Sequence, residues 1–336
     1  MTHSAETDRR LIVLWRVFDD CNLSCPFCAY DKRLGGPRHA VDPARVERVV
    51  DLLGDWRRAY CRPVLLSWLG GEPLMWAPLA ALSARAAEQG LDLSLTTNGT
   101  LLGSPRVRED LVRRYREVTV SIDGPAAFHD GMRGWPGAFD KLSRYVPALV
   151  ADRDAAGAGL KVRANVVLMR DNIADFEDLC LTLAGWGVDE ISFNQLGGRD
   201  RPEFFPDHRL RPDDVTFLAG LLPGLRAELA ARRTALVGGA AYVARIADTV
   251  AGRPLPIGDC RVAERFLFID EAGRIAPCSF TPQHFALSVD ELREPSDLEA
   301  LPGRLRELQW RTPSRDCADC PSTQQFAKFE PLGAGA

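Results

Sequence analysis

Strand-like and helix-like segments alternate along residues 11–250, and this alternation restricts the chain to α/β architectures. Six short runs rich in Val, Ile, Leu and Phe have the length and composition of strands, at residues 11–18, 63–69, 91–97, 117–123, 160–168 and 189–196. Helix-like stretches follow them, at residues 43–56, 77–89, 105–115, 137–150, 172–186 and 212–231. Repeated βαβ units give a parallel sheet with right-handed crossovers. The pattern leaves open a full or partial TIM-like barrel and an open, doubly wound sheet.

The composition is that of an ordinary globular protein. Charged residues make up 26% of the 336 residues, and the formal net charge is −4. Acidic and basic side chains are interleaved, whereas nucleic-acid binding calls for a basic stripe. No run approaches the ~18 apolar residues of a membrane span, and the polar start MTHSAETDRR lacks the apolar stretch of a signal peptide. We therefore expect a cytoplasmic protein with no nucleic-acid or membrane partner.

Three of the nine cysteines stand in one short loop directly after the first strand, in the sequence Cys21-Asn-Leu-Ser-Cys25-Pro-Phe-Cys28. In a reducing compartment, clustered cysteines are metal ligands or catalytic groups more often than disulfide partners. Soft thiolates select an iron–sulfur cluster, zinc or Cu(I). Three thiolates leave one iron of a 4Fe–4S cubane open to a substrate. Zinc would need a fourth ligand, for which His39 is the nearest histidine.

A second set of four cysteines lies toward the C-terminal end of the chain: Cys260, Cys278, Cys317 and Cys320. A Pro- and Gly-rich linker at residues 251–260 ends at the first of these cysteines, and residues 266–277 have the pattern of a β-hairpin with an Ala-Gly turn. From spacing alone, four thiolates suit either a tetrahedral zinc or a fully ligated 4Fe–4S cluster. We expect a main domain at residues 1–250, a small metal-organised domain at residues 257–330, and a disordered tail, PLGAGA.

The loop C-x3-C-x-aromatic-C at residues 21–28 resembles the cluster-binding loop of the radical S-adenosylmethionine (SAM) superfamily. Three further motifs resemble that family, each at a strand end. Residues 67–73, SWLGGEP, resemble its GGEP motif after the second strand, and residues 96–100, TTNGT, end the third. Residues 121–124 and 129–133 together resemble its SxDG…HDxxR pattern after the fourth strand.

The resemblance implies a binding site for SAM. Its members here would be Phe27, Gly71, Glu72, Asn98, Ser121, Asp123 and Arg133. By the family pattern, the GGEP backbone and Glu72 contact the SAM amino group, and Phe27 faces the adenine. Ser121 and Asp123 lie near the ribose. Arg133 pairs with the carboxylate, for which its forked guanidinium is suited. Cys21, Cys25 and Cys28 would hold the SAM-binding 4Fe–4S cluster.

The resemblance also implies a fold and a second cluster. The fold is a partial (βα)6 TIM-like barrel with a small C-terminal iron–sulfur domain, because the later cysteines resemble the Twitch domain, a shortened SPASM domain. A full SPASM domain has further cysteines after the last pair and holds two auxiliary clusters, whereas no cysteine follows Cys320 here. The resemblance therefore favours one auxiliary 4Fe–4S cluster over zinc.

The chemistry implied is abstraction of a hydrogen atom by a 5′-deoxyadenosyl radical, with ferredoxin or flavodoxin as the reductant. The single auxiliary cluster resembles the 2-deoxy-scyllo-inosamine dehydrogenase type, and only ten residues precede the first strand. We therefore expect no fused peptide-recognition domain and a small-molecule substrate, a sugar or aminocyclitol of natural-product biosynthesis. The enzyme would then be an oxidoreductase catalysing a dehydrogenation.

Two alternatives stay open. One is a ribosomal-peptide (RiPP) maturase that acts on a precursor peptide. The other is a radical SAM epimerase, in which Cys61 or Cys180 donates a hydrogen atom, although Cys180 lies on an apolar helix face. Asn194 and Gln195, which open a polar loop after the sixth strand, are the candidate substrate-binding residues. The sequence does not single out a general base.

Overall fold

The strands form one continuous sheet whose parallel part follows the order of the sequence. In the computed structural model, which describes residues 10–285, 287–326 and 328, the strand order is β10-β9-β8-β1-β2-β3-β4-β5-β6-β7. Neighbours from β1 to β7 pair in parallel. These strands are β1 (Leu11–Phe18), β2 (Val64–Gly70), β3 (Asp92–Thr97), β4 (Glu117–Ser121), β5 (Lys161–Leu168), β6 (Glu190–Gln195) and β7 (Ala235–Leu236). The tail PLGAGA lies outside the described residues.

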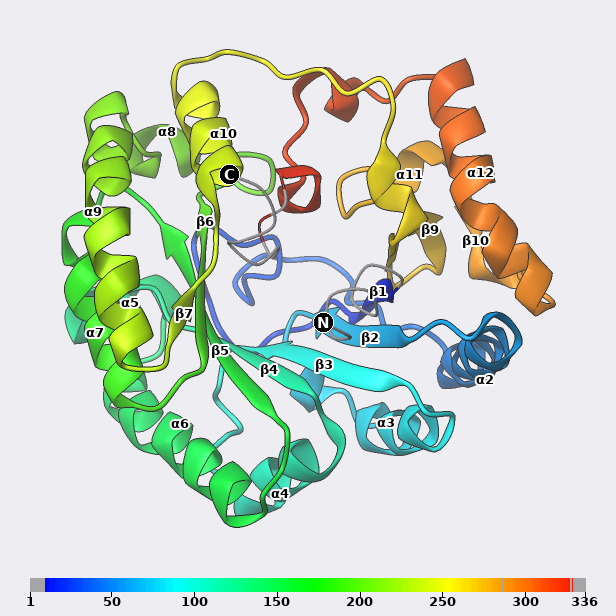
Figure 1. The fold of residues 1–336 in the computed structure, drawn as a ribbon, viewed down its shortest axis with the longest axis horizontal. Helices are drawn as coiled ribbons and strands as arrows, with labels where there is room; N and C mark the ends of the chain where they lie inside the picture. Colours follow the sequence, from blue (N-terminus) through cyan, green and yellow to red (C-terminus); the bar gives the residue numbers. More distant parts are fainter. Residues whose placement is uncertain (1–9, 286, 327, 329–336) are drawn as a thin grey trace.

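The sheet curves without closing. β7 and β10 are the edges of the described sheet, and they are not paired with each other. Figure 1 shows the parallel strands curving around a centre, with the helices outside them. The chain is therefore α/β with a partial TIM-like barrel, as predicted, and the closed barrel and the open doubly wound sheet are excluded.

Helices cover the outer face of the sheet. The six that were predicted are present as α2 (Pro43–Tyr60), α3 (Leu79–Glu88), α4 (Pro105–Arg114), α6 (Ala138–Ala155), α7 (Phe176–Gly185) and α9 (Pro212–Ala231). Along β1 and β5, burial alternates residue by residue. Trp15 and Val162 are fully buried beneath the helices, where each such side chain contributes roughly 1.5–3 kcal/mol. The residues between them, among them Arg16 and Asn165, line the inner face of the barrel.

Other helices of the described chain were not predicted. They are α5 (Ala126–Arg133), α8 (Phe205–His208), α10 (Ala240–Val250), α11 (Pro282–Phe285) and α12 (Pro295–Arg311). The helix α5 follows the SxDG motif directly and ends at Arg133, so it carries that arginine back toward the cysteine loop. Pro302 lies inside α12 and interrupts the sequence pattern of that helix.

The C-terminal segment extends the barrel sheet beyond β1. β8 (Phe266–Ile269) and β9 (Arg274–Ala276) form the predicted hairpin, and β10 (Leu287–Ser288) pairs with β9. Gly273 takes a positive φ of 81° in the hairpin turn, a conformation that glycine adopts without strain. β8 also pairs in parallel with β1, a contact that the sequence did not predict. Whether residues 257–330 form a separate domain stays a prediction.

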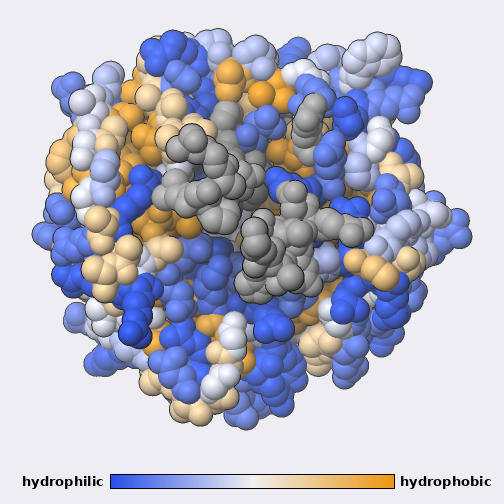
Figure 2. Space-filling view, in the orientation of Figure 1, coloured by the Kyte–Doolittle hydropathy of each residue, from blue (hydrophilic) through white to orange (hydrophobic). Residues whose placement is uncertain are grey.

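The surface agrees with the composition. The rim of the face in Figure 2 is mostly hydrophilic, with smaller apolar patches between the polar regions. Within the described part of the chain, every helix is too short or too polar to cross a bilayer.

Candidate functional site

The first three cysteines lie together in the loop that connects β1 to α2. Backbone N–H groups approach two of the sulfurs: Leu23 N lies 3.5 Å from Cys21 Sγ, and Tyr30 N lies 3.4 Å from Cys28 Sγ. Burial raises the pKa of Cys28 to about 12, and the charges of Cys25 and Cys21 contribute to the rise. The three thiols are therefore close enough for their charges to interact, in a partly enclosed loop.

A buried arginine links this loop to the SxDG motif. Arg133 is 8% exposed. Its Nη2 lies 2.7 Å from Oδ2 of Asp123, and its Nη1 donates to Cys25 Sγ at 3.8 Å. The guanidinium also lies over the ring of Phe27, 5.4 Å from its centroid. Burial alone would lower the pKa of Arg133, but Asp123 and the thiols raise it. Arg133 is therefore a fixed cation beside the sulfurs.

The donor set fits an iron–sulfur cluster. Arg133 favours the thiolate forms of two of the three soft donors, Cys25 and Cys28, and Arg133 Nε is buried without a hydrogen-bond partner. His39, the fourth ligand that zinc would need, is exposed and bonds Asp19 (Nδ1–Oδ2 3.0 Å). Across the described residues, no three Cys, His, Asp or Glu side chains stand in the tight arrangement of a single metal-ion site.

Glu72 of the GGEP motif is fully buried and holds the end of β3. Its carboxylate accepts hydrogen bonds from Thr97 Oγ1 at 2.7 Å, Asn98 N at 2.7 Å and Leu74 N at 3.2 Å. Burial raises the pKa of Glu72 to about 7, against the effect of these hydrogen bonds. In this structure Glu72 is thus a positioning residue, and its contact with the SAM amino group stays a prediction.

Asn98 and Gly71 bring two more motifs against the cysteine loop. Asn98 Nδ2 lies 2.9 Å from Asn22 Oδ1 and 3.7 Å from Cys21 Sγ. Gly71 has no room for a side chain, because a Cβ there would lie 1.9 Å from the carbonyl oxygen of Asp20. The backbone of the GGEP motif therefore runs directly against the start of the cysteine loop.

Two more predicted SAM residues, Ser121 and Asp123, lie at the carboxyl end of β4. Asp123 is fully buried, and its Oδ1 accepts a hydrogen bond from Val167 N at 2.9 Å. Its backbone N donates to Nδ1 of His129, a buried residue to which the sequence analysis gave no role. Ser121 ends β4 opposite Asn165 of β5. The ribose contacts of Ser121 and Asp123 stay predictions.

The two candidate substrate residues point in different directions. Asn194 Oδ1 accepts a hydrogen bond from Lys328 Nζ at 2.6 Å, within the polar inner face of the barrel. Gln195 Nε2 instead donates to Thr249 of α10 at 3.2 Å. Lys328 is buried, and burial lowers its pKa to about 7. The sequence analysis missed this lysine because a single Lys near the C-terminus carries no recognisable pattern.

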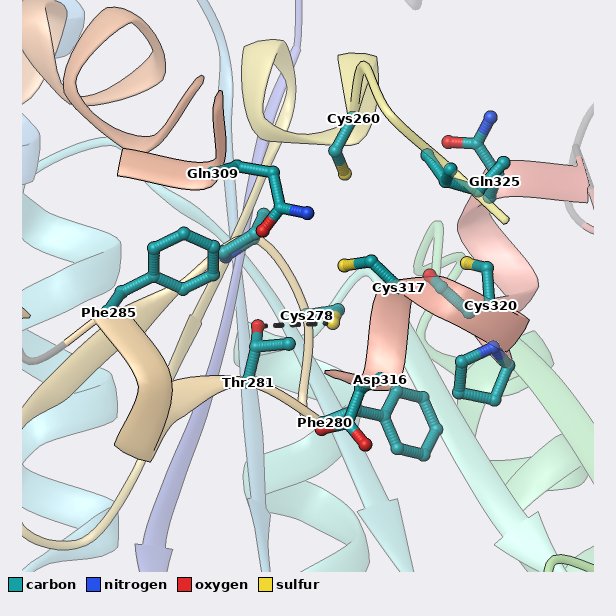
Figure 3. A pocket seen from close by; sticks show the side chains of 14 residues that line it. Cys260, Cys278, Phe280, Thr281, Phe285, Gln309, Asp316, Cys317, Cys320 and Gln325 are labelled. Atoms are coloured by element: carbon teal, nitrogen blue, oxygen red, sulfur yellow. Dashed lines mark hydrogen bonds between the residues drawn. The ribbon is translucent and has the colours of Figure 1, made fainter. Parts of the chain in front are cut away.

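The four later cysteines line one small cavity, which Figure 3 shows from close by. They come from three places: the start of η3 (Arg261–Glu264), the end of the hairpin, and η5 (Arg315–Asp319) with the residue after it. Burial, together with the charges of Cys278, Cys260 and Cys320, raises the pKa of Cys317 to about 11. The structure therefore brings together four thiols from three separate segments of the chain.

The last two cysteines lie away from both groups. Cys180 belongs to the buried face of α7 and is fully enclosed in the core. Cys61 caps the C-terminal end of α2, just before β2 begins. It is therefore at the amino ends of the parallel strands, opposite the cysteine loop. Neither position favours a role as hydrogen donor.

Comparison with known proteins agrees with this geometry. The model of the radical SAM superfamily matches residues 15–183, half of the chain. An AdoMet-dependent heme synthase of Nitratidesulfovibrio vulgaris is 30% identical over 169 residues, 50% of this chain and 43% of that protein. The chain thus spans less than half the length of this relative. A PqqA peptide cyclase of Xanthomonas euvesicatoria pv. vesicatoria is 26% identical over 294 residues, 85% of this chain and 72% of that protein.

Solved structures show a similar fold. Streptococcus suis SuiB superimposes with a TM-score of 0.66 at 16% identity, over 89% of this chain and 68% of that chain. SuiB bound to precursor peptide SuiA gives a TM-score of 0.58 at 18% identity, over 80% and 59% of the two chains. On the match of the family model, with the cysteine loop and the three motifs inside it, this chain belongs to the radical SAM superfamily, whose enzymes use SAM and a 4Fe–4S cluster.

Proposed function

We propose that this radical SAM enzyme modifies a peptide by abstracting a hydrogen atom from it. The observation that carries the proposal is the similarity to the PqqA peptide cyclase, which extends over 294 residues. An alignment of that length is longer than the barrel segment, so it reaches into the segment of the later cysteines. The similarity to the heme synthase covers only 169 residues and therefore says less about the substrate.

In this proposal Cys21, Cys25 and Cys28 hold the SAM-binding cluster. The cluster and SAM together supply a one-electron cleavage that yields a 5′-deoxyadenosyl radical, with ferredoxin or flavodoxin as the electron source. Arg133 keeps a positive charge beside Cys25 and favours the thiolate. Phe27, on which the guanidinium lies, is suited to contact the adenine.

Residues of the GGEP motif and of the end of β3 hold the first cysteine loop in position. Glu72 fixes Asn98 through a hydrogen bond to its backbone, and Asn98 fixes the loop through Asn22. We assign Gly71, Ser121 and Asp123 to SAM binding on their family pattern. Gly71 packs against the start of this loop, and Asp123 is joined to it through Arg133. A rigid arrangement of this kind holds the reacting groups in line and excludes water.

We further propose that Cys260, Cys278, Cys317 and Cys320 hold one auxiliary 4Fe–4S cluster. Four thiols around one cavity satisfy every iron of a cubane, and zinc is the alternative. Anaerobically reconstituted protein should then bind about eight irons, and the Cys21→Ala, Cys25→Ala, Cys28→Ala variant about four. About four irons with one zinc in the parent would refute the auxiliary cluster.

Dehydrogenation of a sugar or aminocyclitol, which the sequence analysis preferred, is the competing candidate. The single auxiliary site is the observation that favours it, because an oxidised cluster accepts the second electron of an alcohol oxidation. Similarity to the 2-deoxy-scyllo-inosamine dehydrogenase type has no support from the relatives described above. The epimerase alternative is weaker still, given where Cys61 and Cys180 lie.

Isotope transfer distinguishes the two substrates. Cells that carry the gene are grown on deuterated medium, and their extract is incubated with reconstituted enzyme, SAM and dithionite. Deuterium should appear in 5′-deoxyadenosine, and treatment of the extract with protease should abolish that transfer. Transfer that survives protease and follows the small-molecule fraction would overturn the peptide proposal. The Cys25→Ala variant is the control and should give no labelled product.

A further inference from the structure

One loop contacts residues that lie beside both groups of cysteines. It comprises residues 196–204, between β6 and α8. Arg201 Nη1 lies 3.2 Å from Oδ2 of Asp31, a buried residue in the loop of the first three cysteines. Two residues earlier, Arg199 Nη2 lies 2.8 Å from Oδ1 of Asp316. The loop thus connects the SAM-binding end of the barrel with the second cysteine group.

Arg199 makes two contacts with described residues that are next to cysteines of the second group. Its guanidinium lies 4.7 Å from the centre of the Phe280 ring, two residues after Cys278, and its ionic partner Asp316 immediately precedes Cys317. Phe280 and Asp316 both line the cavity of the four cysteines, and Figure 3 shows them on one side of it. One positive and one negative charge therefore stand at the edge of the same cavity.

Charged side chains beside a cluster change its reduction potential, because the charge of the cluster changes on reduction. Adding an electron makes the cluster more negative, so a nearby cation stabilises the reduced form and a nearby anion destabilises it. The side chains of Arg199 and Asp316 are 39% and 36% exposed. Their effect should therefore be moderate and should weaken as salt is added.

We propose that Arg199 and Asp316 are a positioning pair that sets the reduction potential of the auxiliary cluster in opposite directions. Arg199 raises the midpoint potential and Asp316 lowers it. The inference rests on the auxiliary cluster proposed above. Residues 196–204 would then have two tasks. Arg199 adjusts how readily the auxiliary cluster accepts an electron, and Arg201 binds Asp31 of the first cysteine loop.

The test is a redox titration followed by electron paramagnetic resonance. It uses the full chain carrying Cys21→Ala, Cys25→Ala and Cys28→Ala, so that only the auxiliary cluster contributes to the spectrum. Arg199→Gln should lower the midpoint potential relative to this parent, and Asp316→Asn should raise it. The double variant should return close to the parent, because the pair is neutral as a whole. Both shifts should shrink in high salt.

Two further variants serve as controls. Arg199→Lys keeps the charge and should keep most of the parent potential. Arg304→Gln removes an arginine of α12 that pairs with Glu291 instead (2.7 Å), and should leave the potential unchanged. Iron content measured for every variant verifies that the cluster is bound.

The outcomes separate this inference from the proposal on which it rests. A parent that binds no iron refutes the auxiliary cluster, and the inference with it. A parent with about four irons, but equal potentials in Arg199→Gln, Asp316→Asn and the parent, refutes the inference alone. Shifts of the same sign in both single variants also contradict it, because opposite charges cannot act in the same direction.

Discussion

Arg133 and Asp123 form a buried ion pair, with 2.7 Å between Nη2 and Oδ2, and the same guanidinium reaches Cys25 Sγ at 3.8 Å. One arginine therefore connects the end of α5, the SxDG motif and the first cysteine loop. The pair lies where water screens little. The ion pair can stabilise the site only while both Arg133 and Asp123 are present, because either charge alone would be buried without a partner.

Removal of one partner of this pair should be costly. Arg133→Gln leaves the Asp123 carboxylate buried without its cation, and should lower the free energy of unfolding by about 3–5 kcal/mol. Adding Asp123→Asn removes the uncompensated charge and should recover part of that loss. Urea denaturation of the iron-free proteins measures both effects. Equal stability of Arg133→Gln and the parent would show that the pair is not buried as described.

The SAM affinity of Arg133 variants is a separate question. If Arg133 also pairs with the SAM carboxylate, its replacement by Lys should weaken binding by roughly 1.5–3 kcal/mol, because the forked geometry is lost while the charge stays. Isothermal titration with SAM under anaerobic conditions measures the affinity of the reconstituted variant. Unchanged affinity would limit Arg133 to a structural role.

The GGEP backbone is predicted to tolerate no added atoms at Gly71. In Gly71→Ala the new Cβ meets the Asp20 carbonyl oxygen at 1.9 Å, so the cysteine loop must shift and the iron content of the first site should fall. Gly131→Ala is the matched control, because a Cβ there meets nothing within 4 Å. Iron analysis after reconstitution compares the two variants. A full iron complement in Gly71→Ala would contradict the close approach.

The raised pKa of Glu72 should make the stability of the protein depend on pH. Its pKa is raised by burial from 4.5 to about 7, so the folded state holds a proton that the unfolded state releases between these values. Stability should therefore decline as pH rises from about 4.5 to 7, by at most about 3 kcal/mol. Glu72→Gln cannot ionise and should lack this component. Parallel unfolding curves of the two proteins at pH 5, 6 and 7.5 would contradict the raised pKa.

The sequence predicted the repeating part of the fold because its signals are local. Apolar runs marked the strands, and the helix-like stretches between them are also local features. At the start of α2, for example, the Asp42 side chain accepts a hydrogen bond from Ala44 N, two residues later, at 3.1 Å. Pairing between segments that are far apart in the chain has no recognisable pattern in the local sequence. The contact of β8 with β1 was therefore not predictable, and neither was the pair Arg199–Asp316.

The site was partly predictable for the same reason. Motif order placed Cys21, Glu72 and Asn98 at neighbouring strand ends, and the structure brings them together. The sequence did not reveal that the Glu72 carboxylate is occupied by the backbone and hydroxyl of the β3 end. Nor did it reveal the buried Lys328, which contacts Asn194, a residue 134 positions earlier in the chain.

The central claim is that the loop of Cys21, Cys25 and Cys28 makes this chain a radical SAM enzyme. The most direct measurement is the release of 5′-deoxyadenosine from SAM after anaerobic reconstitution and reduction with dithionite. The parent should release it, and Cys25→Ala should release none. The Cys317→Ala, Cys320→Ala variant, which keeps the first loop, should still release it. Equal release by Cys25→Ala and the parent, or none from the fully reconstituted parent, would contradict the account.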